Sequence, residues 1–276
     1  MNELGLQRHV VSPWFAVQPG QQYTLVSVTP AHTATWGAVL RDAFRRAYIS
    51  DQLLDQRAEA TQNTRAAILA AKLPDPGAVM SGDFGEIVGY IYLAAREQGS
   101  TPIGPKRWRL KQDRTKPAPF SDVVQFILPE WPQATGADRL VCAEVKAKAT
   151  ASDFRPIAKA IEGSQLDSTS RLIRTIVWLR ERALLGDDIG AVTLPQLQRF
   201  IDATDFPAYT RQFHAIAVIC TNLLQHELAT IVPNMIPENC ALVVVSIPNL
   251  RDTYTSVYQA VHDSVSTNVA LVGANT

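Results

Sequence analysis

The sequence predicts an α/β sandwich, in which a central mixed β-sheet is flanked by helices and preceded by a small N-terminal cap region. Segments with apolar residues at three- and four-residue spacing alternate along the chain with short apolar segments typical of strands. Two late segments, 213–222 and 241–248, are apolar almost throughout, as in interior strands covered on both faces. The order helix, three strands, helix, strand, helix, strand and helix therefore favours a mixed sheet between helical layers.

The N-terminal part predicts short strands followed by helices. Residues 1–30 contain β-like pieces such as QYTLVSVTP, and over residues 35–71 the apolar spacing is helical. The segment LPDPG, residues 73–77, breaks this pattern with two prolines and a glycine. We therefore predict a boundary between an N-terminal region of residues 1–76, which caps the protein or docks a partner, and a main domain of residues 77–276.

The main domain is predicted to begin with a helix over residues 81–99. Ser81 or Asp83 can cap this helix, and Glu86 lies three residues after Asp83, as in a capping box. After it we expect an antiparallel meander of three strands, a long helical stretch interrupted near Gly163, and then two strands and two helices. Their ranges are 106–112, 121–128 and 139–148 for the meander, 154–185 for the helical stretch, 213–222 and 241–248 for the later strands, and 223–231 and 252–265 for the last helices.

The composition is that of a globular protein with a sizeable core, because 46% of the 276 residues are hydrophobic and 19% are charged. No apolar run approaches the roughly 18 residues that span a bilayer, and the N-terminus lacks the plan of a signal peptide. We therefore expect a cytoplasmic protein that makes no membrane contact. Its three cysteines, Cys142, Cys220 and Cys240, are far apart and form no CxxC, which predicts buried thiols without a zinc site.

The formal net charge is zero. Phosphate contacts dominate the affinity of free-standing, non-specific DNA-binding proteins, and these proteins usually carry a basic surplus. If this chain cuts nucleic acid, its charge balance therefore indicates that a partner delivers the substrate.

The most informative segment is LVCAEVKAK, residues 140–148. On a strand, Glu144, Lys146 and Lys148 share one face, and a small apolar face suited to packing under a helix lies opposite. That apolar face consists of Val141, Ala143, Val145 and Ala147. Opposite charges side by side on an otherwise apolar strand are typical of a metal-dependent nuclease, whose acids hold a divalent cation while its lysine orients or deprotonates the attacking water.

Two further acids stand near this segment in the predicted order of elements. Asp122 begins the preceding strand, SDVVQFIL, and Glu86 lies on the helix before the strands. We predict that Glu86, Asp122 and Glu144, with the carbonyl of Val145, hold Mg²⁺, with Mn²⁺ as a substitute, and that Lys146 acts on the water. A solvated strand face explains the alternation of Glu144 and Lys146 equally, and a helix-capping role explains Glu86.

The D…ExK pattern resembles the PD-(D/E)xK nuclease superfamily, and the predicted order of elements is similar to its restriction-endonuclease-like core. The segments SGDFGEIVGYIYL, KRWRLKQ, FSDVVQF and LVCAEVKAKAT resemble the HamA family, the nuclease subunit of Hachiman antiphage defence systems. This resemblance is best over about residues 81–182. It implies a DNase effector bound to a superfamily 2 helicase subunit (HamB-like), which restrains it until aberrant DNA is sensed. It also implies the catalytic set Glu86, Asp122, Glu144 and Lys146.

The segment KRWRLKQDRTK, residues 106–116, carries six basic residues in eleven. On a strand, Arg107, Arg109 and Lys111 share a face, which predicts a ridge that contacts DNA phosphates beside the catalytic strands. Lys148 extends the charged face of its own strand and is a further candidate for phosphate contact. A charged, solvated edge strand explains the same pattern without nucleic acid.

Two other functions fit these residues. A nuclease fold without catalytic activity would serve as an interaction or adaptor subunit, since fold does not fix function. An RNase would use the same site, because the sequence displays no reader of a 2′-hydroxyl. Gln165 stands near the position where some nucleases of the superfamily carry a glutamine that contacts the site, but its loose spacing favours a surface position. Motifs of serine hydrolases, P-loop NTPases and dinucleotide enzymes are absent from the sequence.

Overall fold

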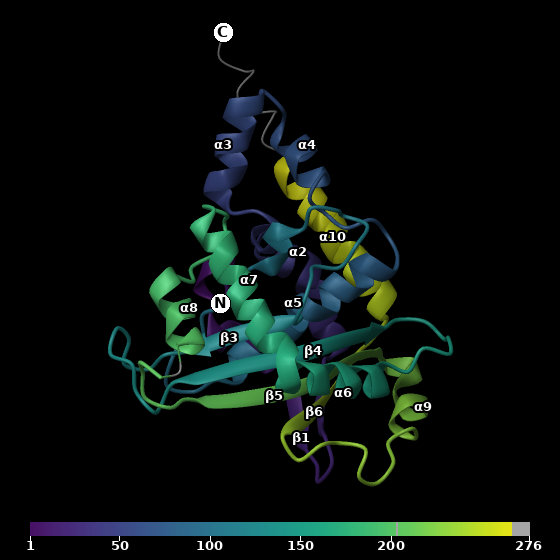
Figure 1. Ribbon diagram of the computed structural model, residues 1–276. Coiled ribbons are helices and arrows are strands. Elements are labelled where there is room, and N and C mark those ends of the chain that lie inside the picture. Colours follow the sequence, from purple (N-terminus) through teal and green to yellow (C-terminus); the bar gives the residue numbers. More distant parts are fainter. Residues whose placement is uncertain (203, 267–276) are drawn as a thin grey trace.

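A six-stranded mixed sheet forms the centre of the molecule (Figure 1). The computed structural model describes residues 1–202 and 204–266. The strands are β1 (Ala16–Pro19), β2 (Thr24–Ser27), β3 (Val123–Ile127), β4 (Arg139–Lys148), β5 (Thr210–Cys220) and β6 (Cys240–Ile247). They lie in the order β1-β2-β6-β5-β4-β3. The four inner strands are parallel to one another, and β1 and β3 are antiparallel to their neighbours at the two edges.

Helices cover both faces of this sheet, which confirms the predicted sandwich (Figure 1). One layer contains α2 (Pro30–Tyr48), α5 (Ala78–Arg96) and α10 (Leu250–Ser266), and the other contains α6 (Pro156–Leu166), α7 (Leu172–Leu184) and α8 (Leu194–Ile201). The shorter helices are α1 (Arg8–Val11), α3 (Asp51–Thr61), α4 (Arg65–Ala70) and α9 (Leu224–Leu228). Among the described residues, no helix has both the length and the apolar character that crossing a bilayer requires.

The predicted apolar face of β4 does pack under a helix. Gly85 and Gly89 of α5 lie directly over it, and a Cβ at either glycine would come within 3.1 Å of a β4 side chain. The nearest atoms belong to Ala147 and Val145, respectively. Small residues on both partners therefore let α5 approach β4 closely.

The first 76 residues share the sheet and the core of the rest of the chain. β2 pairs in parallel with β6, and α2 packs along α10. The predicted boundary at residues 73–77 falls in the loop between α4 and α5. A role of this region in docking a partner stays a prediction.

Residues 106–112 do not form the predicted strand. Arg107–Leu110 is a 3₁₀ turn, η3, so the expected meander is reduced to the antiparallel pair of β3 and β4. The alternation of basic and apolar residues misled the prediction because Trp108 and both flanking arginines are buried. The alternation therefore does not separate a core side from a solvent side.

Two details of the predicted helices also change. Gly77 is the N-cap of α5, so Asp83 and Glu86 lie inside the helix and form no capping box. Gly163 lies within α6, and the irregular part of the 154–185 stretch is a π-helical segment, η4 (Asp167–Arg171), between α6 and α7. A π-helical turn shifts the side chains that follow it around the helix, which matters for the site below.

Replacing Gly89 by leucine is expected to lower the free energy of unfolding by about 1–3 kcal/mol, because the added side chain would push α5 away from Val145. Gly82 lies on the same helix, and among the described residues nothing lies within 4 Å of a Cβ placed there. Gly82→Ala should therefore raise stability by about 0.5–1 kcal/mol through helix propensity. Urea denaturation of both variants measures the difference, and a Gly89→Leu protein as stable as wild type would contradict the close packing.

Candidate active site

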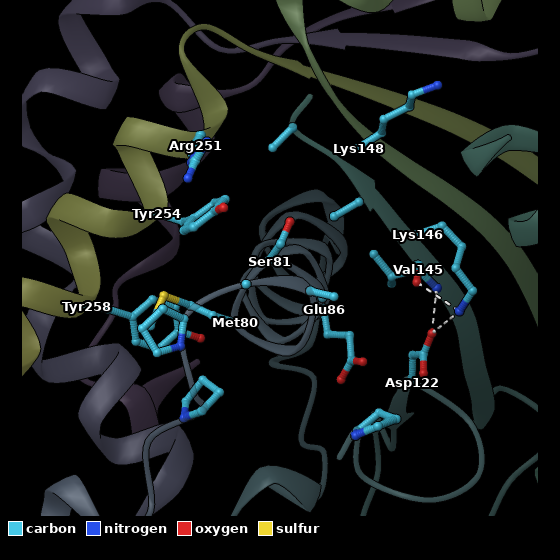
Figure 2. Close-up of a pocket in the computed structure, with 18 of the residues that line it drawn as sticks. Met80, Ser81, Glu86, Asp122, Val145, Lys146, Lys148, Arg251, Tyr254 and Tyr258 are labelled. Carbon is cyan, nitrogen blue, oxygen red and sulfur yellow. Dashed lines mark hydrogen bonds and ion pairs between the residues drawn. The ribbon is translucent and has the colours of Figure 1, made fainter. Parts of the chain in front are cut away.

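A groove of about 1090 Å³ runs from the end of β4 across the start of α5 to α10 (Figure 2). The residues predicted to be catalytic all line it, namely Glu86, Asp122, Glu144 and Lys146. Figure 2 shows Asp122 and Lys146 on one side of the groove and Tyr254 and Tyr258 of α10 on the other. Glu86 projects from α5 between these two sides.

Strand pairing brings Asp122 against the ExK segment. β3 and β4 are antiparallel with Val123 opposite Ala143, so Asp122, directly before β3, comes next to Glu144. The Asp122 carboxylate accepts a hydrogen bond from the backbone N–H of Val145 at 2.9 Å. Two acids that are far apart in the sequence are thus neighbours in space, as the D…ExK pattern predicts.

The ammonium group of Lys146 lies among three oxygen atoms. Its Nζ is 3.3 Å from Asp122 Oδ2 and 3.2 Å from the carbonyl oxygen of Val145, and it also donates to Glu144 Oε1. Two carboxylates and a carbonyl that converge on one cation form a donor set of the kind Mg²⁺ prefers. The residues present therefore fit the predicted metal, including the carbonyl that we expected to take part.

Glu86 stays apart from the other two acids. Its buried carboxylate accepts a hydrogen bond from Trp108 Nε1 at 2.9 Å. The guanidinium group of Arg107 lies between the acids. Its Nη2 atom is 3.7 Å from Glu86 Oε2 and 3.6 Å from Asp122 Oδ1. In the part of the chain that the structure describes, no three acidic, histidine or cysteine side chains surround a single point in the manner of a metal site. Joint coordination by all three predicted acids would require Arg107 to move.

Burial and mutual repulsion disturb the protonation of these acids. Burial and the charge of Asp122 raise the pKa of Glu144 to about 7, although Lys146 and Arg171 oppose the shift. The same two causes raise the pKa of Glu86 well above its usual value. Burial alone would lower the pKa of Lys146, but the carboxylates of Asp122 and Glu144 raise it, so the lysine stays charged. A bound dication would relieve the repulsion among the acids.

Arg171 is a site residue that the sequence analysis missed. It ends the π-helical segment, where its guanidinium donates to the Glu144 carboxylate and, at 2.7 Å, to the carbonyl of Gly163. Its Nε also donates to Asp167 Oδ1 at 2.6 Å. No local pattern marks this arginine, because its partner lies on β4 and the π-helical turn that orients it has no clear sequence signal.

The predicted phosphate-contacting residues do not form an exposed ridge. Arg107, Arg109, Lys111 and Lys148 are all at most 8% exposed. Their charges are matched inside the protein. Arg109 pairs with Glu3 and Asp188, Lys111 with Asp83, and Lys148 with Glu227. Arg107 donates to the Ala118 carbonyl at 2.6 Å besides facing two site acids. The predicted exposed ridge is therefore wrong, and these four residues belong to an internal network of ion pairs.

Gln165 is exposed and is not among the residues that line the groove. The structure therefore gives it the surface position that the sequence spacing favoured.

The model of one protein family, HamA, matches residues 15–261. The chain belongs to the HamA family. Membership in this family makes it a component of a Hachiman antiphage defence system. A search of curated proteins found no match. The match extends well beyond the 81–182 stretch in which the sequence resemblance was best and includes the edge strand β1 and most of α10.

In this HamA protein, Glu144→Gln is expected to flatten the pH dependence of stability between about pH 4.5 and 7. A carboxyl whose pKa is raised on folding holds its proton more tightly in the folded state. Its favourable contribution is therefore complete below the unfolded value of 4.5 and is lost as the pH rises through the folded value of about 7.

The part of this loss that is due to Glu144 should be on the order of 1–3 kcal/mol in wild type and should be missing from the variant, which keeps the contribution of Glu86. Denaturant unfolding with EDTA at several pH values measures both slopes. Glu162→Gln, at an exposed glutamate of α6, serves as the control and should retain the wild-type slope. Equal slopes in Glu144→Gln and wild type would contradict the raised pKa.

Proposed function

We propose that this HamA-family protein is a Mg²⁺-dependent nuclease that hydrolyses DNA. The convergence of Asp122, Glu144, the carbonyl of Val145 and Lys146 on one side of the groove carries the proposal. Carboxylate and carbonyl oxygens suit a hard dication, and the neighbouring ammonium group of Lys146 suits the negative charge of a phosphodiester. All four residues line the groove, so a substrate bound there would lie beside them.

Each residue would have a separate task. Asp122, Glu144 and the Val145 carbonyl would hold Mg²⁺, and Glu86 would join them if Arg107 moved. The bound metal would polarise the scissile phosphate and lower the pKa of the attacking water. Lys146 would orient that water and offset the negative charge that develops on the phosphate oxygens. Arg171 would hold the Glu144 carboxylate in its orientation.

The charge distribution supports a partner in substrate delivery. The net charge of the protein is zero. The four basic residues that we predicted to contact phosphate, Arg107, Arg109, Lys111 and Lys148, instead form ion pairs inside the protein. With few unpaired basic residues near its site, such as the exposed Arg251, the chain alone gains only modest long-range attraction for DNA. We propose that a superfamily 2 helicase subunit binds the DNA, restrains the nuclease and brings the strand to the groove.

One observation favours a second candidate, a catalytically inactive adaptor. Arg107, Lys146 and Arg171 already compensate the three acids without any metal. A site that only needs to be stable could stay in this state permanently. Metal binding and cleavage separate the two candidates. Hydrolysis of RNA would be a variant of the first, since the chemistry at the phosphate is the same.

Purified protein is expected to cut supercoiled plasmid DNA in Mg²⁺, alone or with any helicase that co-purifies with it. Lys146→Ala should lower the rate by about 100-fold or more, because the cation beside the water is lost. Lys159→Ala is the matched control, since this exposed lysine pairs with Glu162 on α6, away from the groove. If Lys146→Ala, Asp122→Ala and Glu144→Ala all cut like wild type, the proposed site is wrong.

Mg²⁺ is expected to raise the melting temperature of the wild-type protein by a few degrees at saturating concentration. A ligand that binds the folded state alone stabilises it by about 2.7 kcal/mol at 100 times its Kd. Asp122→Asn should remove most of this gain, whereas Asp263→Asn, on α10, should retain it. A melting temperature that is unchanged by Mg²⁺ or Mn²⁺ would favour the adaptor.

A further inference from the structure

Two phenylalanines are exposed at the rim of the groove. Phe120 is 37% exposed and Phe154 is 41% exposed, and both line the groove. Phe120 lies two residues before Asp122, and Phe154 lies on the loop that follows β4. Scattered exposed apolar residues are normal on a protein surface. Two aromatic rings beside one set of acidic and basic side chains are a more specific arrangement.

The backbone of Phe120 is held in an unfavourable conformation. Its φ is +69°, in the left-handed region that bulky side chains rarely adopt. Arg107 stabilises this turn by donating hydrogen bonds to the carbonyls of Ala118, Phe120 and Ser121. The ring of Trp178 lies behind the Phe120 ring, with 5.6 Å between their centroids. The surrounding structure therefore fixes an exposed ring in place, as is common at binding sites.

Phe154 is held by a buried ion pair. Lys148 Nζ donates to the carbonyls of Ser152 and Phe154, each at 2.7 Å, and to Glu227 Oε1 at 2.7 Å. Lys148 is 4% exposed and Glu227 is fully buried. Lys148, which we predicted to touch phosphate itself, thus fixes the loop that presents Phe154 to the groove.

We infer that Phe120 and Phe154 stack on unpaired bases of a single nucleic-acid strand whose phosphate lies at Asp122 and Lys146. Aromatic rings bind bases of any sequence by stacking, but the faces of a paired base inside a duplex are already covered by its neighbours. Arg251 is exposed and lines the same groove, where it suits a phosphate backbone, whereas Arg114, also at the groove, is paired with Asp75. The volume of about 1090 Å³ suits a short length of one strand.

This inference rests on the proposed nuclease function in one respect only, namely that the phosphate at Asp122 is the one to be cleaved. Binding and cleavage are therefore measured separately. The full-length protein is titrated with a fluorescent oligodeoxythymidylate and with a fluorescent hairpin duplex of equal length, in EDTA and at about 50 mM salt. Fluorescence anisotropy reports both affinities without cutting.

Wild type is expected to bind the single strand more tightly than the duplex. Phe120→Ala and Phe154→Ala should each weaken single-strand binding by about tenfold and leave duplex binding unchanged. Phe154→Tyr, which keeps an aromatic face, should bind like wild type. Leu185→Ala is the control, because Leu185 is 75% exposed and is not among the residues that line the groove. Melting curves identify any variant that fails to fold, in which case Phe120→Leu replaces Phe120→Ala.

The result distinguishes this inference from the nuclease proposal. Equal binding of single strand and duplex, no detectable binding of the single strand, or unchanged binding by both alanine variants would overturn the stacking sites, whether or not plasmid is cut. Tight, phenylalanine-dependent binding of the single strand without any metal-dependent cleavage would support the stacking sites and count against the nuclease.

Discussion

Close approach of helices to both faces of β4 is the constraint on which the site depends. Gly85 and Gly89 allow α5 to lie against one face. On the other face, Gly163 brings α6 so near that a Cβ there would lie 2.4 Å from the Glu144 side chain. Because side chains alternate along a strand, β4 presents apolar side chains to α5 and the carboxylate of Glu144 to α6. The helix that carries Glu86 and the strand that carries the ExK acids are thereby fixed relative to each other.

Charge balance in a buried place is the second constraint. Unpaired buried carboxylates are costly, on the order of several kcal/mol each, and the protein compensates them with Arg107, Lys146 and Arg171. These cations come from η3, β4 and the π-helical segment, so three separate parts of the chain must be in place before the acids can be buried together. On the proposed function, a divalent ion would take over part of this compensation.

Regular elements could be predicted from the sequence where the pattern is local. The alternation in residues 139–148 identified β4, its apolar face and the acid and lysine opposite, because a strand fixes which neighbours share a side. The segment 106–112 has a similar alternation, yet it forms a 3₁₀ turn whose buried cations pair with carboxylates from distant segments. Such pairings depend on the complete fold. For the same reason Arg171 and the stabilising role of Lys148 were not predictable.

The topology also has a consequence for how the protein is made. β2 lies beside β6, with Leu25 opposite Val244, and α2 packs along α10, so elements from the two ends of the described chain complete one sheet and one helical layer. Contacts between segments this distant in sequence form slowly, because a long loop must close first. During synthesis on the ribosome, the strands that carry the ExK acids emerge well before α10, the far side of the groove. A partly synthesised chain therefore has the strands of the ExK acids before it has the far side of the groove.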